Sequence, residues 1–483
     1  MKKIIRYLLV LVSLSLFFSG AVYYSFNVML CGVLAFWVNN LIYSFENVKN
    51  RIFFMFFNFM IFVFLLSRPT ISMVRGNVWW YFAENDVIFA LNALMLTLIF
   101  LFLGQLIGER AINRREGIAS SKLLSSSVSD DFIKGLRIIS LMLYFLSIFC
   151  FIVTEFEKLV YMRGKAYEEL YTSFKTSLPY VITTIGSMNK YFLCIFLASM
   201  PKKKLAFVPL VLYVVSEVPS LIIGLRNPIV LNAIFAFLYY FIRDALENQR
   251  KWLGIVERVA IIAFAPIAIL LLGAYNYIRA GQKVVQGGAF ELFVDFLYKQ
   301  GVSFDVLCIG HNSIPKIKYT GFVNYTFGGF IDYFAHNNLA QILFGARSLG
   351  TGNNINMALY SNNFSHRMSY VSRGQEYLDG NGWGSSYLLE TYADFGYVGI
   401  ILFSVLLGLL FAYMMVIISR GNFCFSIVLI ILTSIYFCPR DEALGWINFV
   451  IYMQFLLPVA VCFLFAKLCV KRYSCKDMIK NYQ

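Results

Sequence analysis

The sequence has 483 residues, of which 59% are hydrophobic and only 14% are charged, whereas soluble domains have about 45–50% apolar and about 25% charged residues. The formal net charge of +15 does not indicate nucleic-acid binding, because the Lys and Arg residues lie in small groups at the ends of apolar runs. The composition excludes a soluble globular protein and predicts an all-α, polytopic membrane protein.

Apolar runs recur along the chain, and each is long enough to cross roughly 30 Å of hydrocarbon as a helix. The first run begins with basic residues like a signal peptide, but we interpret it as an uncleaved helix, because the charges downstream then alternate correctly. We predict about twelve spans by length and hydropathy, at residues 4–22, 24–44, 52–67, 87–107, 137–155, 179–199, 205–223, 228–242, 256–277, 396–418, 423–437 and 447–467.

Basic clusters set the predicted topology, since cytoplasmic loops of membrane proteins are enriched in Lys and Arg. With the amino terminus inside, these clusters fall on the cytoplasmic side. We therefore expect nine spans in 1–277, a large extracytoplasmic loop at 278–395, and three spans with a basic cytoplasmic tail in 396–483. A structureless loop of this length is unusual, so we expect helices within it, at "FELFVDFLYKQGVSF" and at "FIDYFAHNNLAQILF".

Three arginines lie at predicted outer membrane edges: Arg226 in "GLRNPIVLN", Arg279 in "YNYIRAGQ" and Arg440 in "FCPRDEALGW". An isolated arginine there is explained by contact with lipid headgroups, or by a local pair such as Arg440 with Asp441 or Glu442. Three on one face favour an anion site, because the planar guanidinium donates two parallel hydrogen bonds to phosphate and stays charged.

Histidines are the candidate bases. Asp332 and His336 are four residues apart, so on one helix the carboxylate could fix the imidazole tautomer and raise its basicity. A surface histidine with an incidental neighbour remains the alternative. His311 in "IGHNSIPK" is the second candidate, and His366, beside Arg367, is the weakest.

Carboxylates offer further contacts. Glu390 and Asp394 lie four residues apart before the tenth span, where they either position a hydroxyl-rich substrate or pair at the helix entrance. Glu84 and Asp86 in "AEND" give only a weak similarity to the acidic pair of metal-dependent lipid-linked glycosyltransferases. No clustered metal ligands or cofactor motifs occur, so we predict neither a metal nor a cofactor.

Five segments together resemble the O-antigen and capsule repeat-unit polymerases of the Wzy type. They are "GLRNPIV", "QGVSFDVL" at 300–307, "YTFGGFIDYF" at 325–334, "GSSYLLETYADFGYVGIILFSVLLG" at 384–408 and "CPRDEALGW". The resemblance extends from about residue 220 to 450 and is most specific in the segment 384–408.

The resemblance implies a GT-C-like glycosyltransferase of the bacterial inner membrane, working on its outer face in the synthesis of lipopolysaccharide or capsule. Such an enzyme moves a glycan from undecaprenyl pyrophosphate to the non-reducing end of another lipid-linked repeat unit, with inversion and without a metal. A chain-length regulator and a flippase are the expected partners.

The resemblance also implies roles for single residues. Arg226 and Arg279 would bind the donor pyrophosphate, with Arg440 as a third ligand, and His336 would activate the acceptor hydroxyl. Two alternatives remain: an O-antigen ligase, which shares the arginine chemistry, and a lipid-linked oligosaccharide flippase. A flippase is disfavoured because its halves should be similar and its loops short.

Overall fold

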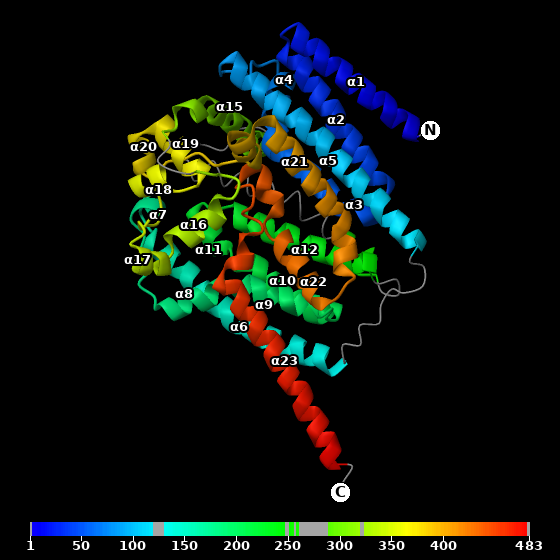
Figure 1. The fold of residues 1–483 in the computed structure, drawn as a ribbon, viewed down its shortest axis with the longest axis vertical. Coiled ribbons are helices and arrows are strands. Elements are labelled where there is room, and N and C mark those ends of the chain that lie inside the picture. Colours follow the sequence, from blue (N-terminus) through cyan, green and yellow to red (C-terminus); the bar gives the residue numbers. More distant parts are fainter. Residues whose placement is uncertain are drawn as a thin grey trace. The chain divides into compact units, whose positions relative to one another are not determined.

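The computed structural model describes residues 2–118, 130–246, 251–255, 257–259, 288–318 and 323–480. Across these ranges the regular secondary structure is entirely helical (Figure 1). The chain divides into two compact units that interleave along the sequence. Unit 1 comprises Met1–Ile118, Ile255–Met415 and Tyr436–Gly445, and unit 2 comprises Ala119–Gly254, Val416–Ile435 and Trp446–Gln483.

Unit 1 is built on helices that include its apolar candidate membrane spans. They are α1 (Lys2–Val22), α2 (Phe26–Glu46), α3 (Val48–Ile61), α4 (Ser67–Val74), α5 (Glu84–Ile118) and α21 (Tyr387–Ile418), with a π-helical turn, Phe62–Leu66, between α3 and α4. In Figure 1, α1, α2 and α5 lie side by side, and α2 contacts α1, α3 and α5. Glycine allows close approach where helices meet, since a Cβ on Gly408 would lie 2.3 Å from the Leu101 carbonyl oxygen of α5.

The long segment before α21 adds short helices to unit 1. They are α14 (Ala289–Gln300), α15 (Ser303–Ser313), α16 (Gly328–His336), α17 (Asn338–Phe344), α18 (Ile355–Tyr360), α19 (Phe364–Arg373) and α20 (Gln375–Leu378). The prediction that this segment contains its own helices is confirmed. The expected helix over 330–344 is two helices, because the Asn337 side chain accepts a hydrogen bond from the Ala340 amide and starts α17.

Unit 2 contains a second set of helices, which again includes apolar candidate membrane spans. They are α6 (Asp130–Tyr161), α7 (Glu169–Thr172), α8 (Tyr180–Ser187), α9 (Asn189–Ala198), α10 (Lys203–Val215), α11 (Val218–Ile223), α12 (Asn227–Leu246), α22 (Asn422–Leu432) and α23 (Met453–Lys480). Helix α6 contacts α8, α9, α11 and α23 and so connects most of this unit.

Ten helices in the described part are long and apolar enough to cross a membrane, so the all-α, polytopic membrane fold is confirmed. They occupy the positions of ten of the predicted spans. The expected span 256–277 falls, apart from residues 257–259, outside the described residues. The expected last span is a shorter apolar helix, Met453–Cys469, because a 3-10 turn at Asn448–Ile451 replaces its beginning.

Candidate functional site

A histidine and a carboxylate meet where α15 packs against α5 in unit 1. The buried face of α15, with Phe304, Leu307 and Cys308, sets this contact. Asp86 lies in the first turn of α5, where the helix dipole favours an anion. His311 Nδ1 lies 2.6 Å from Asp86 Oδ1. The structure thus joins two residues that are 225 positions apart in the sequence.

The environment of His311 suits proton transfer. Asp86 is only 5% exposed, whereas the His311 side chain is 25% exposed. The imidazole stacks on Phe89 with 4.4 Å between ring centroids and contacts Tyr392 at 5.7 Å. A carboxylate at Nδ1 favours the tautomer that carries its proton there and leaves a lone pair on Nε2. Within the described part of the chain, Nε2 makes no hydrogen bond.

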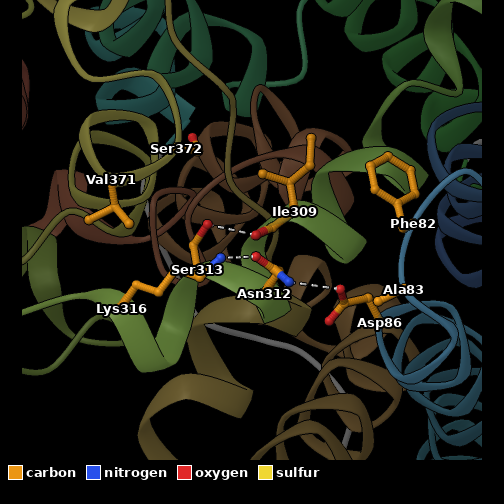
Figure 2. A pocket seen from close by; sticks show the side chains of 9 residues that line it. All are labelled: Phe82, Ala83, Asp86, Ile309, Asn312, Ser313, Lys316, Val371 and Ser372. Carbon is orange, nitrogen blue, oxygen red and sulfur yellow. Dashed lines mark hydrogen bonds between the residues drawn. The ribbon is translucent and has the colours of Figure 1, made fainter.

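A cavity of about 360 Å³ opens beside Asp86 (Figure 2). The other Asp86 oxygen, Oδ2, accepts a hydrogen bond of 3.2 Å from Asn312 Nδ2. Lys316 Nζ in turn donates to Asn312 Oδ1, as the dashed lines in Figure 2 show. Ser313 and Ser372 add hydroxyl groups, and Phe82 adds an aromatic ring. The Asp86–His311 pair is therefore continuous with a polar cavity in the same unit.

The predicted Asp332 and His336 both lie on α16, where each has a partner from elsewhere. Asp332 accepts hydrogen bonds from the backbone and side-chain nitrogens of Asn362, at 2.8–3.0 Å. Burial raises the pKa of Asp332, opposed by these bonds and by the nearby His336. His336 Nδ1 lies 2.8 Å from the carbonyl oxygen of Arg347. Among the described residues no hydrogen bond joins Asp332 to His336, so its predicted role as base stays a prediction.

The predicted carboxylates Glu390 and Asp394 both bind other segments of unit 1. Glu390 is fully buried, and it accepts hydrogen bonds of 2.7 Å from Ser385 Oγ and from the Ala443 amide. Asp394 accepts from the amides of Tyr325 and Thr326, at 3.0 and 2.6 Å. Through these contacts both carboxylates hold other segments of unit 1 in place. Their binding of substrate stays a prediction.

The segment after α22 contains two adjacent acids, Asp441 and the half-buried Glu442. Glu442 Oε1 accepts a hydrogen bond of 2.6 Å from Asn363 Nδ2. Partial burial, together with Asp441 and Asp332, raises the pKa of Glu442 to about 7. Arg440 donates to Gln300 Oε1 at 3.0 Å. At neutral pH a substantial share of Glu442 therefore keeps a proton that a free carboxyl group would have released.

Of the three predicted arginines, two belong to different compact units and the third lies outside the described residues. Arg226 belongs to unit 2, two residues after the left-handed Gly224 that ends α11 and directly before α12. Arg440 belongs to unit 1. Arg279 lies outside the described residues. A common anion site therefore stays a prediction.

Sequence reasoning gave Asp86 only a weak role and did not pair it with His311. The signal available was an acidic first turn on a predicted helix, which does not identify a partner in a distant loop. Asn312 and Lys316 were not singled out, although both stand beside His311 in "HNSIPK". Among the described residues, no group of three or more His, Cys, Asp or Glu side chains is arranged to hold a metal ion.

Comparison with protein families identifies the class of this chain. A family model described as O-antigen polysaccharide polymerase Wzy matches residues 5–473, which is nearly the whole sequence. Comparisons with curated proteins and with solved structures gave no significant match. The family match extends the resemblance over the amino-terminal half, where the sequence had indicated little beyond hydropathy. The chain therefore belongs to the O-antigen polysaccharide polymerase Wzy family, whose members polymerise lipid-linked repeat units in membranes.

Proposed function

We propose that this protein transfers a glycan from undecaprenyl pyrophosphate to the non-reducing end of a second lipid-linked repeat unit. The reaction takes place on the outer face of the bacterial inner membrane, inverts the anomeric carbon and proceeds without a metal ion, in a GT-C-like enzyme. The family match supports the reaction class. The observation that carries the catalytic step is the 2.6 Å contact between His311 and the buried Asp86.

The chemistry of the pair fits glycosyl transfer. An acceptor hydroxyl has a high pKa and becomes a better nucleophile when a base takes its proton during attack. In the proposed step, the acceptor oxygen bonds to the anomeric carbon while the bond from that carbon to the pyrophosphate oxygen breaks. The hydroxyl proton passes to His311 Nε2, and Asp86 stabilises the imidazolium. Direct displacement accounts for inversion.

Stabilisation of the leaving group is assigned to arginine. Pyrophosphate leaves readily once its developing charge is neutralised by donors that are already in place. We retain Arg226 and Arg279 as its ligands, with Arg440 as a third candidate, on the strength of the family resemblance. Arg226 is tested below as a single substitution.

His336 is the competing base. Its Nδ1 lies near a backbone carbonyl, which also orients the ring but carries no full charge to stabilise an imidazolium. Asp86 supplies that charge to His311 from a buried position, where it is less screened. The proposal therefore assigns the base to His311, which was the second candidate from the sequence.

The test uses purified protein, a defined undecaprenyl pyrophosphate repeat unit and a chelator, with products separated by size. We expect a ladder of repeat-unit multiples. Substitution His311→Gln should lower turnover by about 10²- to 10⁴-fold, the usual contribution of a general base, and the matched His336→Gln should change it little. The reverse result would move the base to His336. If the lipid crossed a vesicle membrane without any elongation, the flippase would replace the polymerase.

Two further experiments test the donor site and the chain-length regulator. Arg226→Ala should abolish elongation in well-folded protein, whereas a ladder of unchanged rate would remove this arginine from the donor site. Addition of a co-expressed chain-length regulator should change the distribution of product sizes rather than the rate of the first transfer. An unchanged distribution would argue against that partner.

A further inference from the structure

The cavity beside Asp86 presents mainly hydrogen-bond acceptors. The Ser313 hydroxyl donates to the Ile309 carbonyl oxygen at 2.7 Å, and the Ser372 hydroxyl donates to that of Met368 at 2.8 Å. Because each hydroxyl has one proton, both can offer only lone pairs to a ligand. Asp86 adds a carboxylate, which also only accepts. A ligand that forms hydrogen bonds with these acceptors must therefore carry several donor groups.

The remaining lining restricts the ligand further. Asn312 Nδ2 has a second N–H beyond the one given to Asp86, and Lys316 adds an ammonium group, so a few donors complement the acceptors. Phe82 and Val371 supply apolar surface on the same cavity. A face with an aromatic ring, aliphatic groups and many acceptors matches a sugar ring, which has C–H faces and many hydroxyl donors. A fully ionised phosphate brings no donor and would meet the Asp86 carboxylate.

The cavity also has a suitable size and position. A volume of about 360 Å³ lies at the lower end of the range for ligand pockets, which is roughly 300–1,000 Å³. A short saccharide, rather than a long polymer, suits this space. Asp86 both contacts His311 and lines the cavity, so a sugar bound there lies against the carboxylate that orients the proposed base.

We propose that this cavity is a saccharide subsite that holds the terminal, non-reducing sugar of the acceptor repeat unit. The assignment of this sugar to the acceptor substrate rests on the proposed function, whereas the binding of a neutral saccharide rests on the cavity alone. Asn312, Ser313, Lys316 and Ser372 then act in recognition of the sugar, and the pyrophosphate of either substrate binds elsewhere.

The test separates binding from turnover. The probe is a short-chain alkyl glycoside of the repeat unit, which lacks pyrophosphate and can serve only as an acceptor. Its binding is measured by saturation-transfer difference NMR on the full chain carrying His311→Gln. Ser372→Phe should fill the cavity and weaken binding at least tenfold. Lys316→Met removes the ammonium group without adding bulk to the cavity and should weaken binding several-fold. The matched control Gln375→Phe places the same ring at an exposed position of the neighbouring helix α20 and should leave binding unchanged.

The binding results test the saccharide subsite separately from the polymerase function. Equal binding in Ser372→Phe and Gln375→Phe, or no binding to the parent chain, would overturn the subsite. Competition by undecaprenyl pyrophosphate free of sugar would also overturn it, because the cavity would then accept the phosphate. If the parent bound the glycoside in a cavity-dependent way but formed no ladder, the polymerase proposal would fail while the saccharide site stood.

Discussion

Substitution of Asp394 should loosen the turn that precedes α16. Its carboxylate accepts two backbone amides, from Tyr325 and Thr326, and the Thr326 hydroxyl at 2.6 Å. Tyr325 and Thr326 are only 3% and 5% exposed, so water does not readily replace the lost acceptor. Asp394→Ala therefore leaves two buried N–H groups without their carboxylate.

The size of the effect follows from these contacts. An unsatisfied buried donor costs about 1–3 kcal/mol, so two such donors reduce the free energy of local opening by about 2–4 kcal/mol after partial relaxation. At 1.4 kcal/mol for each factor of ten, this corresponds to roughly 30- to 1,000-fold faster amide exchange. Thr326→Val removes only the hydroxyl contact and should cost about 1 kcal/mol, with a severalfold change.

Hydrogen–deuterium exchange of a peptide covering 323–336 measures this opening directly. We expect the exchange rates to rank Asp394→Ala above Asp394→Asn, and Asp394→Asn above Thr326→Val and the parent. Asparagine keeps one acceptor oxygen but turns an N–H group toward the amides. A peptide from α2 serves as the internal control and should not change. If Asp394→Ala exchanged like the parent, or if Thr326→Val exceeded it, the assigned role of the carboxylate would be refuted.

Three other substitutions test separate parts of the fold. Burial lowers the pKa of His366 to about 4, below its usual value near 6.5, so the unfolded chain binds more protons between these values. Stability should fall by up to about 3 kcal/mol as the pH drops from 6.5 to 4, and thermal unfolding of His366→Gln should lack this slope. Gly408→Ala should destabilise by about 1–3 kcal/mol through overpacking against α5, measured as a lower unfolding temperature, whereas Gly288→Ala, where no described residue lies within 4 Å of the added Cβ, should not. Glu109→Gln should cost about 3 kcal/mol in the same assay, because Glu109 pairs with Arg51 through two contacts of 2.7 and 2.8 Å.

The membrane helices were predictable because each depends on its own residues. Length and hydropathy alone place a span, and ten spans appear where the sequence indicated them. The break between α16 and α17 was less visible, because the apolar pattern continues across it. There the local signal is Asn337, whose side chain starts the second helix by accepting a backbone amide.

The site was predictable only where partners are close in sequence. Asp332 and His336 do lie on one helix, α16, as their spacing predicted. Their hydrogen-bond partners, however, are Asn362 from a distant segment for Asp332 and the Arg347 carbonyl oxygen for His336. Asp86 and His311 meet only because α15 packs on α5. Hydrophobic periodicity indicates which face of a helix is buried, but it does not identify the helix that covers that face.

Glycine determines the backbone conformation of the segment 384–408, which carries the strongest family resemblance. Gly396 interrupts α21 with φ +62° and ψ −156°, a backbone conformation that is essentially restricted to glycine. A Cβ on Gly399 would lie 2.2 Å from the Thr391 carbonyl oxygen, so the chain also folds back closely there. Residues 387–395 therefore form a separate helical segment ahead of the main span.

That short segment connects the parts of the candidate site in unit 1. Glu390 binds the Ala443 amide, Asp394 holds the turn before α16, and the Tyr392 ring lies 4.5 Å from that of Phe89, on which His311 stacks. If Gly396 sets the orientation of all three side chains, Gly396→Ala should disturb regions that it does not touch.

We expect Gly396→Ala to cost about 1–3 kcal/mol from backbone strain, and also to speed amide exchange in 323–336 and lower polymerase turnover. Gly76→Ala is the matched control, because Gly76 also has a positive φ, +71°, and an added Cβ there would meet no described residue within 4 Å. It should lose stability without changing that peptide. Normal exchange at 323–336 in a destabilised Gly396→Ala protein would show that the glycine only relieves local strain, and that the carboxylates keep their contacts without it.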